Sequence, residues 1–326
     1  MSDYVAGKAL SHSNDYSISV PPEQGRPGFV SILLNNSDMS DYVAGKALSP
    51  SSDYLISVPP EQGSPGFEAF YRISYPPGFD ETKTEETYPV VFQINYNPQT
   101  QGVTDRFEWG LERAITGSAG IFRRGIVTVA IDGIPGSLSR GSKLRYANYR
   151  QFGNNEFDDL IRVMRAIEAK LSYVEHENVG IWGWGYGGFA VTHILTRRLA
   201  SGYFKCGAAI APLSDLKLFD ATYTERYMGL LNDNHEGYAK TDLLNANLTA
   251  LNHTRFLLAH GTADETVHFG NTLRLIRGLY SNAITFKLLV YPDQPHLLND
   301  YKLHIYRELL RHFVKCFQHR KATNEL

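Results

Sequence analysis

The sequence lacks long hydrophobic runs, which is its first informative feature. No apolar stretch approaches the roughly 18 residues that a membrane-spanning helix needs. Residues 1–30 also lack the basic segment followed by an apolar segment that marks a secretory signal. Within the sequence as given we therefore expect no transmembrane segment and no signal peptide, a pattern that by itself favours the cytoplasm.

An excess of charge of one sign is missing as well. The sequence has 32 Lys and Arg, 34 Asp and Glu, and a net charge of −2. Nucleic acid and anionic membranes attract basic proteins, so the charge favours neither partner. With 43% hydrophobic and 20% charged residues, the composition is typical of a globular protein. A length of 326 residues suits one large domain or two ordinary ones.

Cysteine is scarce, because Cys206 and Cys316 are the only two in the chain. From spacing alone, two free buried thiols are the simpler interpretation and a disulfide is the alternative. Acceptor sequons for N-glycosylation begin at Asn35, Asn247 and Asn252, although such triplets also arise by chance. The sequence suggests no cofactor and no metal site.

An internal repeat occupies the N-terminus. Residues Met1–Phe29 recur almost unchanged as Met39–Phe67. A solenoid needs about three or more copies to bury a continuous core, so two copies do not predict one. The segment is rich in Ser, Pro, Gly and Asp, and we expect the first copy to be poorly ordered or a redundant β arm. Near-identity indicates a recent duplication or an error in the assembled gene.

From Glu68 to the end of the chain, short apolar runs alternate with helical patterns, which predicts a mainly parallel sheet with crossover helices. The helix expected from Glu156 places its apolar residues at a 3.6-residue period. We expect strands at Ala69–Tyr75, Val90–Tyr96, Ile126–Ile131, Val179–Trp184, Gly207–Ala211, Phe256–His260 and Phe286–Tyr291. We expect helices at Glu156–Leu171, Gly187–Leu199, Phe269–Tyr280 and Tyr301–Phe317.

A glycine-rich turn joins one of these strands to the next helix. The stretch Gly183-Trp184-Gly185-Tyr186-Gly187 has the strand, tight turn and helix context of a nucleophile elbow. In an active hydrolase the central residue is Ser, Cys or Asp, but here Gly185 has no side chain. The same glycines could also form a βα turn that holds a phosphate group.

Three further segments favour the elbow and carry a resemblance. They are Tyr223–Leu230 (YTERYMGL), His260–Phe269 (HGTADETVHF) and Tyr291–His296 (YPDQPH). With the elbow, they resemble the C-terminal catalytic domain of the dipeptidyl peptidase IV family, among the prolyl oligopeptidases. The resemblance covers about Pro59 to Phe317 and implies an α/β-hydrolase fold, a mainly parallel twisted sheet with helices on both faces, over residues 68–326.

The resemblance also implies catalytic roles. Gly185, Asp264 and His296 follow the α/β-hydrolase order of nucleophile, acid and histidine. On its own, His296 is better explained as a surface-loop histidine, and its register with Asp264 and the elbow is what favours the triad role. The resemblance assigns no triad role to the neighbouring His260 and His268. Losing one triad member costs on the order of 10⁴–10⁶ in rate, so we expect an inactive domain.

The resemblance also implies an oxyanion site, in which one of the two donors stays open. One donor would be the backbone N–H of Tyr186, which follows the nucleophile position. The family's second donor is a tyrosine hydroxyl. One alignment puts Asn95 at that position, and a slip of one residue puts Tyr96 there.

A small apolar pocket for proline or alanine is implied as well, for peptides with either residue at the second position. Thr266 stands where the family has an asparagine that helps to hold the substrate, and Leu216 where it has a tryptophan. The alternative is that these aromatic and aliphatic side chains simply fill the core. The implied lining is Tyr186, Leu213, Leu216, Tyr223, Tyr227, Thr266 and Val267.

Two further family features bear on this chain. Cys206 and Cys316 match a cysteine pair that forms a disulfide in the family, which implies an extracellular or membrane-associated protein. The family's β-propeller carries glutamates that bind a substrate's amino terminus, and Met1–Phe67 is far too short to form one. A truncated or fragmentary gene product is therefore an alternative expectation.

Three functions remain open from the sequence. The first is a non-enzymatic relative that acts through a protein partner or a homodimer. The second is an active hydrolase that uses another nucleophile, for which the elbow offers no Ser, Cys or Asp. The third is a truncated gene product without function.

Overall fold

The computed structural model describes residues 51–60, 66–76, 78–83, 85–94, 97–98, 100–103, 125–132, 134–136, 141–153 and 155–318. The first copy of the repeat, the sequon at Asn35, and both candidates for the second oxyanion donor, Asn95 and Tyr96, lie outside these residues.

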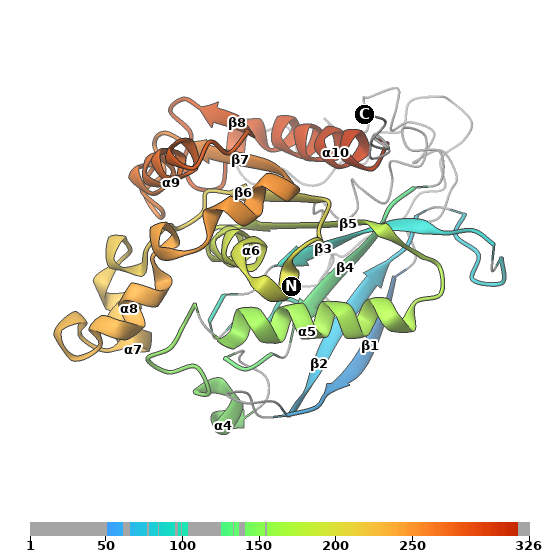
Figure 1. The fold of residues 1–326 in the computed structure, drawn as a ribbon, viewed down its shortest axis with the longest axis horizontal. Coiled ribbons are helices and arrows are strands. Elements are labelled where there is room, and N and C mark those ends of the chain that lie inside the picture. Colours follow the sequence, from blue (N-terminus) through green and yellow to red (C-terminus); the bar gives the residue numbers. More distant parts are fainter. Residues whose placement is uncertain are drawn as a thin grey trace, which may run out of the picture. The chain divides into compact units, whose positions relative to one another are not determined.

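In the described part of the chain, a single sheet of eight strands runs in the order β1-β2-β4-β3-β5-β6-β7-β8 (Figure 1). The pairs β1/β2 and β2/β4 are antiparallel, and every pair from β4/β3 onward is parallel. This arrangement confirms the predicted α/β-hydrolase fold. The strands are β1 Ser51–Val58, β2 Phe67–Ser74, β3 Tyr88–Ile94, β4 Val127–Asp132, β5 Val174–Trp184, β6 Cys206–Ile210, β7 Arg255–Gly261 and β8 Phe286–Tyr291.

Helices connect the strands and pack on both faces of the sheet. The α-helices are α4 Gly141–Arg145, α5 Asn155–Lys170, α6 Tyr186–Thr196, α7 Ala221–Met228, α8 His235–Thr241, α9 Gly270–Ser281 and α10 Lys302–Gln318. The 3-10 turns are η3 Arg198–Ala200, η4 Leu216–Leu218, η5 Leu231–Asp233, η6 Leu243–Asn245, η7 Leu248–His253 and η8 Asn299–Tyr301.

Strand β1 is a finding that the sequence pattern did not predict. It lies within the second copy of the repeat and pairs with β2 along its whole length. Only Ile56 and Val58 of β1 are buried, and its polar residues interrupt the apolar run that would predict a strand. The predicted domain boundary, between residues 67 and 68, falls one residue inside β2. Helices α7 and α8 also went unpredicted, because both are short and rich in polar residues.

The sheet separates two hydrophobic clusters. Ile181 of β5 packs with residues of α5 and α6 in the larger cluster, and the next residue, Trp182, packs with residues of α10 in the smaller one. Successive strand residues point to opposite faces, so one strand supplies both cores. Parallel strands covered on both faces are almost wholly apolar, as β3 and β4 are here.

The predicted disulfide is present between Cys206 at the start of β6 and Cys316 near the end of α10. The two Cα atoms are 6.3 Å apart, and the bond closes a segment with a sequence separation of 110. By restricting the unfolded chain, a loop of this size contributes about 3–5 kcal/mol to stability.

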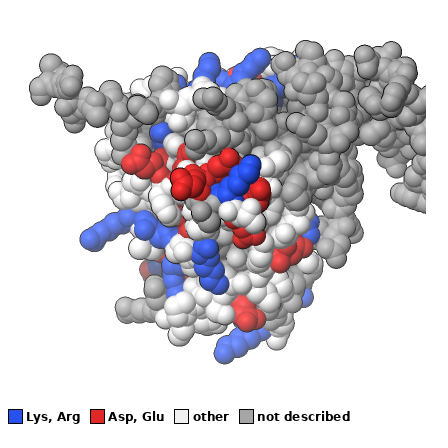
Figure 2. Space-filling view, turned by 90° about the vertical axis from the view of Figure 1, so that its right-hand side faces the viewer, with Lys and Arg blue, Asp and Glu red and all other residues white. Residues whose placement is uncertain are grey.

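Acidic and basic side chains are interspersed among uncharged residues on the face shown in Figure 2. This face therefore has no extended field of one sign, in line with the net charge of −2. None of the helices in the described ranges has both the length and the apolar character needed to cross a membrane.

Candidate active site

Gly185 forms the turn between β5 and α6 and has an unusual backbone conformation. Its φ and ψ angles are 58° and −119°, which side chains of L-residues rarely adopt. Its N–H donates to the carbonyl of Ile210 at 2.9 Å, and its carbonyl accepts from the N–H of Phe189 at 3.0 Å. These bonds hold the turn in the shape of a nucleophile elbow although the nucleophile side chain is missing.

The glycines on either side of Gly185 are required by close packing. A Cβ on Gly183 would collide with the backbone of Gly187, and a Cβ on Gly187 would collide with the carbonyl oxygen of Ile94. Strand and helix approach each other here more closely than any side chain allows. The glycine pattern therefore has a steric cause, with no phosphate group needed to explain it.

His296 faces the nucleophile position. Its Nε2 atom lies 3.1 Å, and its Cε1 atom 3.4 Å, from the point where a Cβ on Gly185 would be. The indole N–H of Trp184 donates to the carbonyl of His296 at 3.0 Å and ties the histidine loop to the end of β5. The side chain of His296 is 16% exposed, so it is partly accessible to solvent.

Asp264 holds the other nitrogen of this ring. Nδ1 of His296 lies 2.7 Å from Oδ2 of Asp264. Oδ1 of the same carboxylate accepts from the N–H groups of Thr266 at 2.9 Å and Val267 at 2.7 Å. Burial opposes ionisation, but hydrogen bonds from His260, His296 and Val267 keep the pKa of Asp264 well below its usual range. The carboxylate is therefore charged and fixed in orientation.

His260 is a second partner of Asp264 that sequence reasoning did not assign. Its Nε2 lies 3.0 Å from Oδ2 of Asp264 and 2.8 Å from the carbonyl of Val267, and its Nδ1 lies 2.7 Å from Oγ1 of Thr272. Two acceptors face Nε2, so that nitrogen carries the proton and Nδ1 accepts from Thr272. The only signal in the sequence was its position at the end of β7, four residues before Asp264.

Tyr186 is the first residue of α6, so its backbone N–H lies at the positive end of the helix dipole. Its hydroxyl donates to Oε1 of Glu156 at 3.2 Å, and its ring packs against Phe157 and Phe189. Its role as an oxyanion donor remains a prediction.

Most of the predicted pocket residues lie in the main hydrophobic cluster. Tyr227 packs edge-on against Tyr223 with ring centroids 4.8 Å apart, and the Tyr223 hydroxyl donates to Oδ1 of Asn97. Burial raises the pKa of Tyr223, so its hydroxyl stays protonated. Thr266 is exposed, two residues after Asp264. Their function as a pocket lining remains a prediction. Buried in the cluster are Tyr186, Leu213, Leu216, Tyr227 and Val267.

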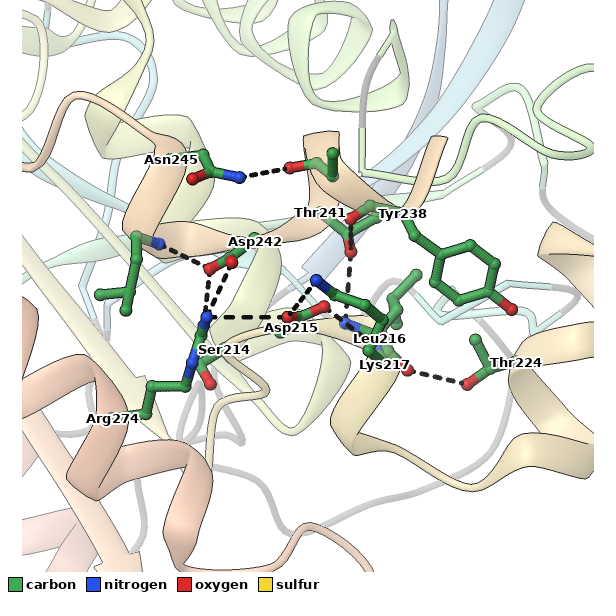
Figure 3. Close-up of polar contacts among 12 residues, drawn as sticks. Ser214, Asp215, Leu216, Lys217, Thr224, Tyr238, Thr241, Asp242, Asn245 and Arg274 are labelled. Carbon is green, nitrogen blue, oxygen red and sulfur yellow. Dashed lines mark hydrogen bonds and ion pairs between the residues drawn. The ribbon is translucent and has the colours of Figure 1, made fainter. Parts of the chain in front are cut away.

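The backbone that carries Leu216 is held by a polar network (Figure 3). The N–H of Leu216 donates to Oγ1 of Thr241 at 3.2 Å, which belongs to α8. From α9, Arg274 forms two bonds to Asp242, at 2.6 and 2.7 Å, and lies 3.8 Å from Asp215. Burial opposes ionisation of Asp242, but the Arg274 bonds lower its pKa. The segment next to the predicted pocket is therefore rigid.

Among the residues that the structure describes, no three or more His, Cys, Asp and Glu side chains are grouped so that they could hold a metal ion.

Known proteins resemble this chain in both sequence and fold. The sequence profile of the prolyl oligopeptidase family matches residues 116–320. Venom dipeptidyl peptidase 4 of Apis mellifera is 34% identical over 247 residues, which are 75% of this chain and 30% of that protein. Dipeptidyl peptidase 4 of Sus scrofa is 33% identical over 254 residues, or 76% of this chain and 31% of that protein.

A solved structure extends this similarity to the fold. Dipeptidyl peptidase 4 of Porphyromonas gingivalis superposes with a TM-score of 0.71 at 29% identity, covering 84% of this chain and 37% of that one. The chain thus spans about a third of the length of the relatives that it matches. It belongs to the prolyl oligopeptidase family, and its α/β-hydrolase part is a catalytic domain of the dipeptidyl peptidase IV kind.

Proposed function

We propose that this chain is a dipeptidyl-peptidase-like domain that does not cleave peptides and acts by binding. The observation that carries this proposal is the lack of a side chain at Gly185, whose backbone keeps the elbow conformation. A Cβ at this position would lie 3.1 Å from His296 Nε2. His296 and Asp264 are arranged to activate a hydroxyl group, but the elbow supplies none. Without a nucleophile there is no acyl-enzyme intermediate.

Other side chains do not take over as nucleophile in this proposal. Both cysteines of the chain are bonded to each other, so neither offers a thiolate. The hydroxyl of Ser214, beside the predicted pocket, is buried and donates to Oδ1 of Asn271 at 3.1 Å. An active hydrolase is therefore the weaker alternative.

The predicted pocket supports a binding role. The proposed ligand is a peptide with proline or alanine at its second position, held among the aromatic rings around Tyr227. The names of two relatives, dipeptidyl peptidase 4 and prolyl endopeptidase FAP of Homo sapiens, suggest this class of peptide. A protein partner or a second copy of the chain, bound elsewhere on the surface, is compatible with the same lack of catalysis.

An extracellular or membrane-associated location is part of the proposal. The Cys206–Cys316 bond needs an oxidising compartment. Asn247 and Asn252 are exposed, as glycosylated residues must be in a folded protein. In the sequon that begins at Asn247, the Thr249 hydroxyl donates to Oδ1 of Asn247 at 2.6 Å. The Apis mellifera relative is named a venom protein, which agrees with export.

Labelling with a fluorophosphonate probe tests the loss of catalysis, because the probe reacts with an activated serine hydroxyl. The natural chain should not be labelled and should not cleave Gly-Pro or Ala-Pro chromogenic substrates. Gly185→Ser should restore weak labelling, because the new Oγ would lie beside the oriented His296 ring.

Gly185→Ala is the matched control, since it adds a Cβ at the same backbone position without a hydroxyl and should stay unlabelled. Labelling of the natural chain at any residue beside His296 would overturn the proposal. Labelling confined to Gly185→Ser would support it and would show that only the nucleophile is missing.

A further inference from the structure

A cationic hollow lies at the opposite edge of the sheet from the candidate active site. It has a volume of about 520 Å³ and lies between the first residues of β7 and β8 and one face of α10. Gly185 and Asp264 follow the carboxyl ends of their strands, whereas this hollow is at the amino ends. Its charged lining consists of Arg255, Lys287, Glu308, Arg311 and Lys315.

The spacing along α10 gathers its charged residues on one face. Residues 308, 311 and 315 are three and four positions apart, so their side chains project on the same side of the helix. Arg255 is the first residue of β7, and Lys287 is the second residue of β8. The four cations therefore approach the hollow from three different elements.

Only one carboxylate in the lining offsets these four cations. Glu308 accepts from Lys287 and, at 2.5 Å, from Arg311. Burial opposes ionisation, but these hydrogen bonds lower the pKa of Glu308 to about 2. The carboxylate is thus already shared by two cations, and the lining keeps an excess of three positive charges.

Arg255 and Lys315 carry most of this excess. Within the described ranges, neither has an ion pair with a carboxylate. The Arg255 guanidinium forms a long hydrogen bond of 3.5 Å from Nη1 to the Lys315 carbonyl, near the negative end of the α10 dipole. The remaining N–H donors of Arg255 and the ammonium of Lys315 are available to a ligand.

His312 does not add a fifth charge at neutral pH. It is buried against the sheet, and its Nε2 donates to the carbonyl of Gly207 at 3.1 Å. Burial first, and then the charges of Lys287 and Arg255, lower the pKa of His312 to about 4. The positive charge of the hollow therefore comes from the lysine and arginine side chains alone.

We propose that this hollow binds a sulfate or phosphate group, either as a free anion or as the ester group of a saccharide. A tetrahedral oxyanion presents oxygens in several directions, which suits donors that converge from β7, β8 and α10. The planar guanidinium of Arg255 can donate two parallel N–H bonds to such a group, and Lys315 adds a point charge. The site is independent of the candidate active site.

Titration calorimetry at low ionic strength tests this proposal with two probes, inorganic sulfate and a heparin-derived tetrasaccharide. The natural chain should bind at least one of them, and added salt should weaken the binding because it screens the charges. Tighter binding of the tetrasaccharide would assign the site to sulfated saccharides, and equal or tighter binding of sulfate would assign it to free anions.

Two double variants distinguish the effect of the charges in the hollow from the effect of the net charge of the protein. Arg255→Gln with Lys315→Gln should weaken binding about tenfold or more, since the anion loses its bonds to two charged groups. Lys143→Gln with Lys170→Gln removes the same net charge from exposed sites outside the hollow and should bind like the natural chain.

Glu308→Gln provides a gain of binding that misfolding cannot imitate. It frees Lys287 and Arg311 from their shared carboxylate, so binding of the anion should tighten severalfold. No binding of either probe by the natural chain, or equal weakening in the two double variants, would overturn the proposal.

Discussion

At the scale of single residues, the candidate active site combines a histidine and a carboxylate with a glycine that has no side chain. His296 forms a 2.7 Å hydrogen bond with Oδ2 of Asp264, and His260 contacts the same oxygen at 3.0 Å. Gly185 keeps a backbone conformation that an L-residue adopts only under strain, whereas glycine adopts it without a steric cost. The elbow geometry is thus imposed by its neighbours and persists without the nucleophile.

Gly185→Ala should therefore destabilise the protein by about 1–3 kcal/mol, because alanine is strained at a φ of 58° and its Cβ would lie 3.1 Å from His296 Nε2. Chemical denaturation would measure the change. Gly202→Ala is a suitable comparison, since Gly202 also has a positive φ, of 70°, but a Cβ there would meet no neighbour within 4 Å. A Gly185→Ala protein as stable as the natural chain would contradict this account of the elbow.

At the scale of elements, side-chain contacts hold the segment between β6 and β7 against α9. Helices α7 and α8 and the turns η4 and η6 all lie in this segment. The bidentate Arg274–Asp242 pair fastens it to α9, and Asp215 lies 3.8 Å from the same guanidinium (Figure 3). Because both carboxylates are nearly fully buried, each depends on its cationic partner.

Arg274→Met should cost about 2–4 kcal/mol at pH 7, because it leaves Asp242 and Asp215 buried with fewer partners. The pKa of Asp242 is lowered in the folded protein, so its pairing stabilises the fold above the carboxyl pKa of the unfolded chain, about 3.9. That contribution is lost as the pH falls through the lower folded pKa. The difference in free energy of unfolding between the Arg274→Met variant and the natural chain should therefore become smaller in acid.

Arg277→Met, three residues along α9, is the matched control, because Arg277 forms no ion pair with the residues that the structure describes. Urea titrations at pH 7 and below pH 4 would compare the three proteins. A difference that stays constant over this pH range would mean that Arg274 acts through packing and not through Asp242.

At the scale of the whole domain, one covalent bond joins the sheet to the last helix. Cys206–Cys316 closes a loop that contains β6, β7, β8 and the residues Asp264 and His296. An unfolded chain with this bond has fewer conformations than one without it, so the bond favours the folded state. It also links the stability of the domain to an oxidising environment.

Replacing both cysteines by serine should lower the free energy of unfolding by about 3–5 kcal/mol, and reduction of the natural chain should have a similar effect. Thermal unfolding with and without reductant would measure both. Protein recovered from secreting cells and denatured without reduction should show no free thiol on titration. Two free thiols in that sample would contradict the bond and the proposed extracellular location together.

The alternation of apolar runs, the glycine pattern around Gly185 and three short motifs were enough to predict the α/β-hydrolase fold and to nominate Asp264 and His296. Those features are local, because strand length, tight turns and motif order depend only on residues close together in the sequence.

Strand β1 escaped prediction because its buried residues alternate with polar ones, and it became a strand only by pairing with β2. His260 and Arg274 escaped because their roles depend on the carboxylates that folding places beside them. The cationic hollow likewise joins Arg255 to Lys315, two residues far apart in sequence. The sequence by itself determined the kind of sheet and the missing nucleophile. Only the tertiary structure decided which charges share a partner, because side-chain electrostatics depend on distance in space and not on position in the chain.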